Sequence, residues 1–103
     1  LFVIVDINEF QAMGRVKEIL NIEPLKDKWQ AFGWEVQEID GHDFEEIEKA
    51  LTESPLQKEK PLIILAKTIK GKGWKRAENN NVFHYKAPSE EEYKEAMDEL
   101  NNA

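Results

Sequence analysis

The sequence has no cysteine and no long hydrophobic run, and each absence excludes a class of protein. Without cysteine the chain can form neither disulfide bonds nor thiolate metal sites. It contains no stretch of about 18 or more apolar residues and no signal peptide, so neither a transmembrane helix nor secretion is predicted. We therefore expect a cytoplasmic protein that does not enter a membrane.

Basic residues are also in the minority. The 103 residues include 14 Lys and Arg against 21 Asp and Glu, which gives a formal net charge of -7. This balance argues against a general binder of nucleic acid or of anionic membranes. The exception is a locally basic stretch between Lys67 and Arg76, which could meet an anionic ligand. With 41% hydrophobic and 34% charged residues, the composition is that of a soluble globular domain or part of one.

The first residues, Leu1 to Val5, are apolar and largely β-branched. Such a run predicts a strand that is buried on both faces, as in a parallel sheet. A central strand needs hydrogen-bonding neighbours on both sides, and this one begins at the first residue of the sequence. We therefore expect residues 1–103 to form the C-terminal part of one larger α/β domain.

The remaining pattern predicts helices and strands in alternation. After an irregular stretch to about Ile22, the expected elements are a helix from Pro24 to Phe32, a strand over 34–39, a helix from Asp43, a polar loop over 54–60, a strand over 61–66, a loop over 67–88 and a helix from Ser89. Strands that alternate with helices imply a parallel sheet with helices on its faces. The loop over 67–88 exceeds the usual length of a connection, which favours a functional role.

Helix-end signals and apolar stripes support these assignments. Asp43 with Glu46, and Ser89 with Glu92, have the spacing of capping boxes, and Gly33 is a natural helix stop. The stripes expected to face inward are Leu25, Trp29 and Phe32; Phe44, Ile47 and Leu51; and Tyr93, Ala96, Met97 and Leu100.

Asp6 and Asn8 follow the first strand, where open α/β sheets place their ligands. The Asn8 amide oxygen is a hard, neutral ligand suited to Mg²⁺ or Ca²⁺. The backbone carbonyl of Phe10 could reach the same ion from a turned loop. From spacing alone, the interpretation of Asn8 as a strand cap or as part of an Asx-turn is favoured over a metal ligand.

Thr68 to Gly73 follows the second apolar strand, where glycine backbone can approach a phosphate closely. The order of residues is not that of a Walker loop, nor of a dinucleotide fingerprint. Phosphate contact and a flexible basic turn both remain open.

The chain has two histidines. His84 lies in the long loop, where it could steer a substrate hydroxyl or transfer a proton, although a lone histidine is more often structural. For His42, in a tight turn before a helix, a loop-fixing hydrogen bond is favoured. No complete catalytic set of residues is present.

Several blocks share one order and spacing with a known family. They are Asp6-x-Asn8, Phe10 to Val16, Glu23 to Trp34, Ile39 to Asp43, Lys67 to Gly73, Glu78 to Asn80 and Val82 to Pro88. This series resembles the transketolase family, specifically the latter part of the thiamine diphosphate-binding, N-terminal domain of bacterial transketolases, including those split into two subunits. The resemblance implies a three-layer, parallel-sheet fold and transfer of a two-carbon ketol unit between sugar phosphates.

The resemblance also implies roles for four residues. In this family Mg²⁺ is bound by an aspartate, an asparagine and a backbone carbonyl; Asn8 matches the asparagine and Phe10 the carbonyl. His84 matches a histidine near the diphosphate and the reacting end of the substrate, so it is the candidate catalytic residue. Ile69 falls near a residue that packs against thiamine diphosphate.

Other family parts have no counterpart in these residues, namely the Gly-Asp-Gly aspartate and the glutamate that activates the cofactor. We therefore expect the isolated chain to be inactive, and its partners to be the remaining transketolase domains or subunit in a homodimer or split-subunit assembly. The alternatives are a non-catalytic truncated domain or interaction module, and an enzyme like the 1-deoxyxylulose-5-phosphate synthases, which share the Asp-Gly-His-Asp and Lys-Gly-Lys-Gly blocks.

Overall fold

The structure, a computed structural model, describes residues 1–52 and 59–102. Its contacts divide the chain into two compact units, a first unit of residues 1–8 and 20–68 and a second unit of residues 9–19 and 69–103. Most of the loop expected over 54–60 lies outside the described residues. Within the described part of the chain, no helix has the length and apolar character needed to cross a membrane.

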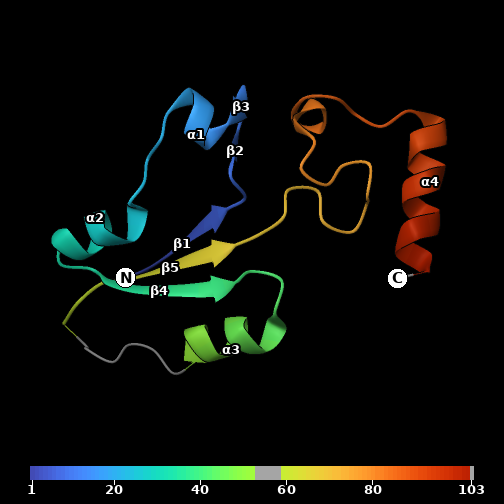
Figure 1. Ribbon diagram of the computed structural model, residues 1–103. Helices are drawn as coiled ribbons and strands as arrows, with labels where there is room; N and C mark the ends of the chain where they lie inside the picture. Colours follow the sequence, from blue (N-terminus) through green and yellow to red (C-terminus); the bar gives the residue numbers. More distant parts are fainter. Residues whose placement is uncertain (53–58, 103) are drawn as a thin grey trace. The chain divides into compact units, whose positions relative to one another are not determined.

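The first unit is built on a parallel sheet. Its strands are β1 (Phe2–Ile7), β4 (Glu35–Asp40) and β5 (Leu62–Lys67), in the order β1-β5-β4 (Figure 1). β5 pairs in parallel with both neighbours, so that Ile63 lies between Val3 and Val36. Because β5 is central, its continuous apolar run is buried on both faces. This confirms the α/β class with a parallel sheet.

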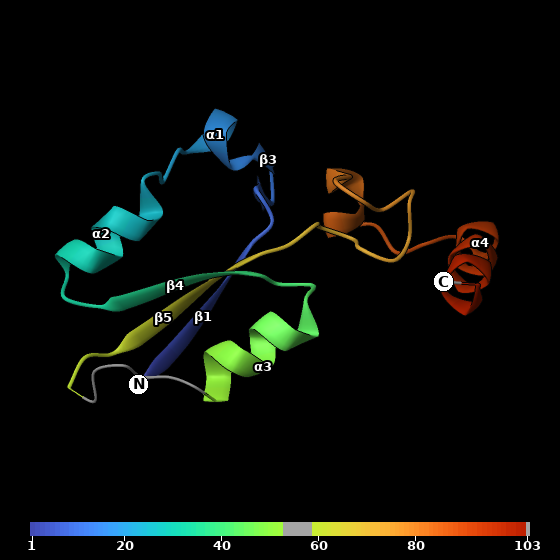
Figure 2. The ribbon, with the colours of Figure 1, turned by 60° about the horizontal axis from the view of Figure 1, so that its bottom comes forward.

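Two helices cover opposite faces of that sheet. α2 (Leu25–Ala31) lies between β1 and β4 in the chain, and α3 (Phe44–Thr52) between β4 and β5. The chain moves across the sheet in one direction from β1 to β4 and back from β4 to β5, so right-handed crossovers put the helices on opposite faces. Figures 1 and 2 show this arrangement of helix, sheet and helix.

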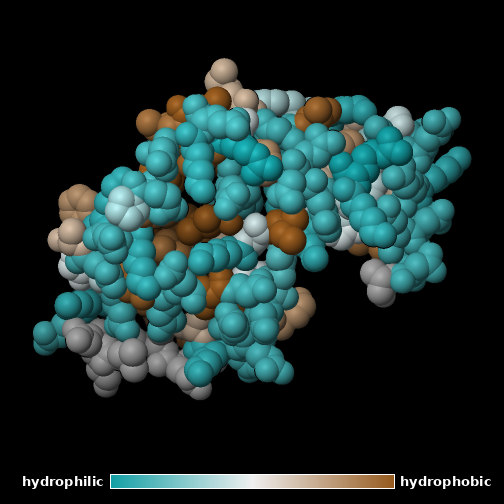
Figure 3. Space-filling view, viewed as in Figure 1, coloured by the Kyte–Doolittle hydropathy of each residue, from teal (hydrophilic) through white to brown (hydrophobic). Residues whose placement is uncertain are grey.

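β1 is not buried on both faces, contrary to the expectation from its sequence. Alternate residues are exposed, with Phe2 at 48% and Ile4 at 59% of their full accessible surface. Within the described residues β1 pairs only with β5, which makes it an edge strand. Hydrophobic atoms are accordingly visible over the strands of the first unit in Figure 3.

The inward face of α3 also differs from the expected stripe. Ala50 is 5% exposed and packs against Leu62 and Ile64, whereas Phe44 is 85% exposed and Leu51 is also exposed. Ile39 of β4 also packs against this cluster, so the small Ala50, rather than the larger residues near the two ends of α3, meets the core. The stripe from Phe44 to Leu51 was therefore wrong at both ends.

The start of α3 has only half of the expected capping box. Asp43 Oδ1 accepts hydrogen bonds from the backbone N–H groups of Glu45 and Glu46, at 2.8 and 3.1 Å. The Glu46 carboxylate, however, accepts from the N–H of Asp40 at 2.7 Å, not from that of Asp43. The Glu46 side chain therefore joins α3 to the end of β4 and does not complete a capping box with Asp43.

α2 ends at the predicted stop, but fewer of its side chains face inward than the predicted stripe of Leu25, Trp29 and Phe32. Gly33 has a φ of 83° and its N–H donates to the Gln30 carbonyl at 2.9 Å, which is a helix end of the kind that glycine favours. Trp29 packs edge-on against Trp34, with ring centroids 4.9 Å apart. Phe32 is 81% exposed and does not belong to the core.

The second unit contains short elements that the sequence does not reveal. They are β2 (Phe10–Gln11), β3 (Gly14–Arg15), α1 (Val16–Ile19) and the 3-10 helix η1 (Asn81–His84), followed by the longer α4 (Glu90–Asn101). β2 and β3 form an antiparallel hairpin. Strands of two residues are too short to show an alternating pattern, so residues 7–22 read as irregular.

α4 begins as predicted but uses another face. Ser89 and Glu92 form the complete capping box. Of the expected stripe, Tyr93, Met97 and Leu100 are exposed. The half-buried side chains belong instead to Ala96 and to three glutamates, Glu92, Glu95 and Glu99.

Candidate functional site

The carboxyl ends of the three strands of the first unit are tied together. The Thr68 N–H donates to the Ile7 carbonyl at 3.1 Å, and the Gly41 N–H donates to the Lys67 carbonyl at 2.7 Å. The Thr68 hydroxyl also donates to the Asp6 carboxylate. Asn8 is half-buried and directly follows β1. These hydrogen bonds therefore hold the backbone that leads into Asn8.

Gly41 is required for that edge to close. A Cβ atom at this position would lie 2.5 Å from Thr68 Cγ2 and 3.0 Å from the Lys67 carbonyl oxygen. The distance to Thr68 Cγ2 is shorter than real Cβ atoms adopt, so a side chain at position 41 would require Thr68 to shift. The Asp40–Gly41 turn therefore owes its position to the absence of a side chain.

Glu9 separates the two proposed metal ligands and turns the chain. Its φ of 64° lies in the left-handed region, which non-glycine residues adopt mainly in turns. Its carbonyl accepts a hydrogen bond from the Val16 N–H at 2.9 Å, and Phe10 then begins the hairpin opposite Arg15. The Arg15 guanidinium lies 4.8 Å from the centre of the Phe10 ring. Phe10 thus follows a turn of the kind that a carbonyl ligand would need.

The turn over Thr68 to Gly73, which contains Gly71 and Gly73, packs against the residues that follow it. Gly71 and Gly73 have φ values of 75° and 102°. A Cβ on Gly71 would lie 2.4 Å from the Ala77 carbonyl oxygen, and Ala77 is buried. The open side of Gly71 is therefore occupied by Ala77, which favours the structural interpretation of this turn over phosphate contact. Ile69 begins the turn and is half-buried.

His84 is the last residue of η1 and is exposed. Its ring meets that of Tyr85 edge-on, with centroids 4.6 Å apart. The helix is capped by Asn80, whose side-chain oxygen accepts from the Val82 N–H at 3.1 Å. A short helix with a capped start gives His84 a defined backbone on a long connection.

His42 is exposed, and its backbone N–H donates to Asp40 Oδ1 at 2.8 Å. This backbone hydrogen bond closes the turn before α3, and the loop-fixing role of the His42 side chain stays a prediction.

The four sequence-predicted site residues belong to different units. Asn8 lies in the first unit, whereas Phe10, Ile69 and His84 lie in the second. No group of three or more His, Cys, Asp or Glu side chains among residues 1–52 and 59–102 could hold a metal ion. The predicted ligands, the Asn8 amide oxygen and the Phe10 carbonyl, are therefore not joined by a cluster of acidic or histidine side chains within these residues.

Sequence reasoning missed two features around these residues. The Asp6–Thr68 hydrogen bond joins residues 62 positions apart, and no local signal could have found it. Three glutamates on α4 bind the loop that carries His84, and their spacing of three and four residues was a signal that could have been read.

Comparisons with known proteins agree on one family. Residues 1–101 match the family described as transketolase, thiamine diphosphate binding domain. The chain is 44% identical over 100 residues to the 6-deoxy-6-sulfo-D-fructose transketolase subunit of Clostridium sp. (strain MSTE9). It is 34% identical over 100 residues to one of the subunits of the apulose-4-phosphate transketolase of Phocaeicola vulgatus. Each alignment covers 97% of this chain and 36% of the relative, so the chain spans about a third of these subunits.

A solved structure shows the same similarity in three dimensions. The transketolase of Campylobacter jejuni subsp. jejuni matches 98% of this chain with a TM-score of 0.84 and 36% sequence identity. The match covers 16% of that protein.

Proposed function

The chain belongs to the transketolase family by its thiamine diphosphate binding domain, and from that premise we propose that it is part of an enzyme that transfers a two-carbon ketol unit between sugar phosphates. The observation that carries this proposal is the match of nearly the whole chain, residues 1–101, to that domain. Two relatives named as transketolase subunits, for a sulfosugar and for a sugar phosphate, support it.

In this proposal Asn8 and Phe10 supply two ligands of a Mg²⁺ ion that holds the diphosphate. The amide oxygen of Asn8 and the carbonyl oxygen of Phe10 are hard ligands of the kind that Mg²⁺ takes. One residue separates them, and the left-handed conformation of that residue, Glu9, turns the chain between the two ligands. The donor set thus fits the ion, and the remaining ligands come from outside these residues.

Thiamine diphosphate, when bound, supplies the electron sink for breaking and forming the carbon–carbon bond. His84 is the proposed catalytic residue, because an exposed imidazole can donate a hydrogen bond to the substrate or carry a proton. Ile69, half-buried and apolar, would pack against the cofactor. Both roles rest on the match of these positions to the family pattern.

We further propose that residues 1–103 are the C-terminal part of one larger domain. The chain spans 36% of its subunit relatives, and β1 has an apolar face exposed at the sheet edge. The missing metal ligand and the activating carboxylate would then come from other segments or from a partner subunit, in a homodimer or a split-subunit assembly. These residues alone would have no transketolase activity.

The proposal is tested by Asn8→Ala in the complete, assembled protein. We expect Mg²⁺ affinity and thiamine diphosphate affinity to fall together, each by about tenfold or more, because one ion bridges the protein and the diphosphate. The measurement is a titration of each ligand in the presence of excess of the other, followed by protein fluorescence.

The matched control is Asn101→Ala, which removes an exposed asparagine from α4 and should leave both affinities unchanged. If Asn8→Ala binds Mg²⁺ and thiamine diphosphate as the parent does, Asn8 is a strand cap and the metal site is wrong.

A further inference from the structure

One face of α4 is directed at the loop that carries His84. Glu92, Glu95 and Glu99 recur at intervals of three and four residues, which places their side chains on one side of the helix. All three are half-buried, although glutamates at a helix surface are normally exposed. Apart from the Ser89 N–H, which donates to Glu92 in the capping box, their partners come from the segment between Trp74 and Lys86.

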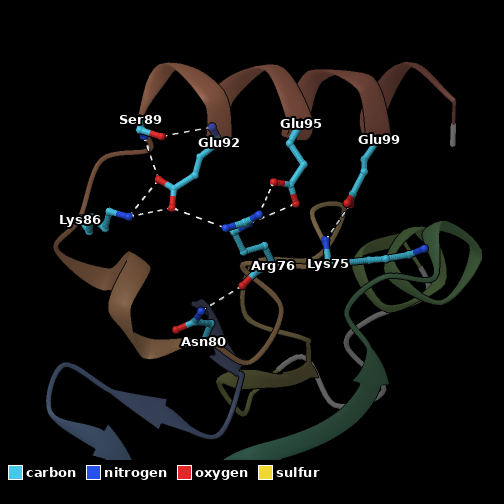
Figure 4. A network of polar contacts seen from close by, with 8 residues as sticks. All are labelled: Lys75, Arg76, Asn80, Lys86, Ser89, Glu92, Glu95 and Glu99. Carbon is cyan, nitrogen blue, oxygen red and sulfur yellow. Dashed lines mark hydrogen bonds and ion pairs between the residues drawn. The ribbon is translucent and has the colours of Figure 1, made fainter.

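The two ends of that segment are bound by different glutamates (Figure 4). At the first end, Arg76 Nη2 lies 2.6 Å from Glu95 Oε2 and Nε lies 3.1 Å from Glu95 Oε1, a bidentate pair. At the second end, Lys86 Nζ donates to both carboxylate oxygens of Glu92, at 2.7 and 2.9 Å.

Further contacts bind the same face of α4 to the loop. The Lys75 N–H donates to Glu99 Oε2 at 2.8 Å. Arg76 Nη1 lies 4.0 Å from Glu92 Oε1, which links the two ends of the loop through one carboxylate. The Glu92 side chain retains only 14% of its accessible surface, so solvent screens these pairs less than it would at an open surface.

The segment between the two ends is closed on itself. The rings of Trp74 and Phe83 lie 4.6 Å apart, and Lys86 Nζ lies 5.4 Å from the centre of the Phe83 ring. The Asn80 amide donates to the Arg76 carbonyl at 3.0 Å. In the sequence, His84 thus lies between Phe83, which packs on Trp74, and Lys86, which pairs with Glu92.

We propose that α4 is an ion clamp that positions His84, with Arg76, Lys86, Glu92 and Glu95 as positioning residues for the proposed transferase reaction. The clamp holds the loop at both ends, so η1 and the backbone of His84 keep one place relative to α4. The inference rests on the proposed function of His84, and none of the four residues is assigned contact with substrate or cofactor.

Two members of the clamp, Glu92 and Arg76, have pKa values shifted in the direction that favours their charged forms. Hydrogen bonds from Lys86 and then from the Ser89 N–H lower the pKa of Glu92, and the pKa of Arg76 is raised, first by its hydrogen bond to Glu95. A carboxyl group whose pKa is lower in the folded state stabilises the fold above its unfolded pKa, about 4.3 for glutamate. That contribution is lost as the pH falls through the folded pKa. Assays near neutral pH therefore examine the closed clamp.

The test is a double-mutant cycle of Lys86→Met and Glu92→Gln in the complete, assembled enzyme. Methionine keeps the contact with Phe83, and glutamine at the third helical position still closes the capping box. We expect amide hydrogen exchange over residues 82–86 to accelerate by on the order of tenfold in either single variant. Exchange over residues 40–43, around His42, should not change.

The kinetic expectation is a fall in kcat of roughly threefold to tenfold in either variant, with little change in KM. The double variant should be no worse than Glu92→Gln alone, since both lack the ion pair between Lys86 and Glu92. Lys86→Arg should retain most of the parent kcat, because arginine keeps the positive charge. The matched control is Lys94→Met on the same helix, because Lys94 is exposed and forms no ion pair within the described part of the chain.

The outcomes separate this inference from the proposed function. Unchanged exchange over residues 82–86 overturns the clamp whatever the role of His84. Faster exchange with a kcat within about twofold of the parent, while His84→Ala lowers kcat, overturns the positioning role alone. If His84→Ala leaves kcat unchanged, the catalytic role of His84 is wrong, and the positioning role is overturned with it.

Discussion

Two glycines in this chain, Gly41 and Gly71, lie where a side chain would meet a neighbouring segment. A Cβ atom on Gly41 would overlap the Thr68 side chain, and a Cβ atom on Gly71 would overlap the backbone of Ala77. Gly33 differs, because it has a positive φ of 83° but no atom within 4 Å of the Cβ position. These two situations predict different costs of substitution.

Gly71→Ala should destabilise the protein by about 2–4 kcal/mol, since the left-handed conformation costs roughly 1–2 kcal/mol and the overlap with Ala77 adds to it. Gly33→Ala should show the conformational cost alone. Thermal or chemical unfolding of both variants measures the difference. Equal costs for the two variants would show that the turn at Gly71 can open without penalty.

The sequence predicted which residues could serve as metal ligands, but not the hydrogen bonds that hold the neighbouring backbone in place. Asn8 was found because it follows an apolar strand, a local feature. The hydrogen bond between Thr68 and Asp6 depends on pairing of β1 with β5, and the partner of a side chain that distant cannot be read from spacing. A local sequence pattern predicts where a candidate ligand lies along the chain. The hydrogen bonds that hold that ligand in place depend on which strands pair in the folded protein.

At the scale of elements, the sequence predicted the longer strands and helices well and their orientation poorly. β4, β5 and the start of α4 lie within a residue of their predicted positions. The inward faces of α3 and α4 were wrong, because size and charge overrode hydrophobicity. Ala50 packs on the sheet since it is small, and the α4 glutamates turn inward since their partners are basic.

Ile64→Ala should be among the more damaging substitutions in the first unit. Ile64 is 1% exposed at the centre of β5 and packs against Ala50 of α3. Loss of this side chain leaves a cavity, and we expect a cost of about 2–5 kcal/mol in unfolding free energy. Phe44→Ala, on the same helix–sheet layer but 85% exposed, should cost within about 0.5 kcal/mol. Comparable losses would mean that the core is assigned to the wrong face of α3.

At the scale of the whole molecule, β1 differs from the adjacent strand β5 because alternate side chains of β1 are exposed. Ile4 is the register partner of Ile64 and lies on the same face of the sheet, yet it is 59% exposed. An apolar strand at a sheet edge is a template for pairing with another strand. The proposal that these residues belong to a larger domain requires this face to be covered.

Ile4→Ala in the complete protein therefore reports on that proposal. If another segment covers β1, the variant should lose about 2–5 kcal/mol of unfolding free energy, as a core isoleucine does. Ile64→Ala serves as the reference, because it removes the same side chain from the adjacent position of the same face. A loss below about 1 kcal/mol for Ile4→Ala, beside a full loss for Ile64→Ala, would sink the idea of a covering segment.

The pairing of β1 with β5 has a consequence for the order of folding. Phe2 lies opposite Leu62, so two adjacent strands are far apart in the chain, whereas β4, α3 and β5 follow one another directly. Contacts between distant segments carry a larger loop-closure cost and slow folding. We expect β4, α3 and β5 to assemble first and β1 to dock late. The hydrogen bond from Thr68 to Asp6 would then form only once the first unit is complete, and the backbone leading to Asn8 would be among the last parts to become ordered.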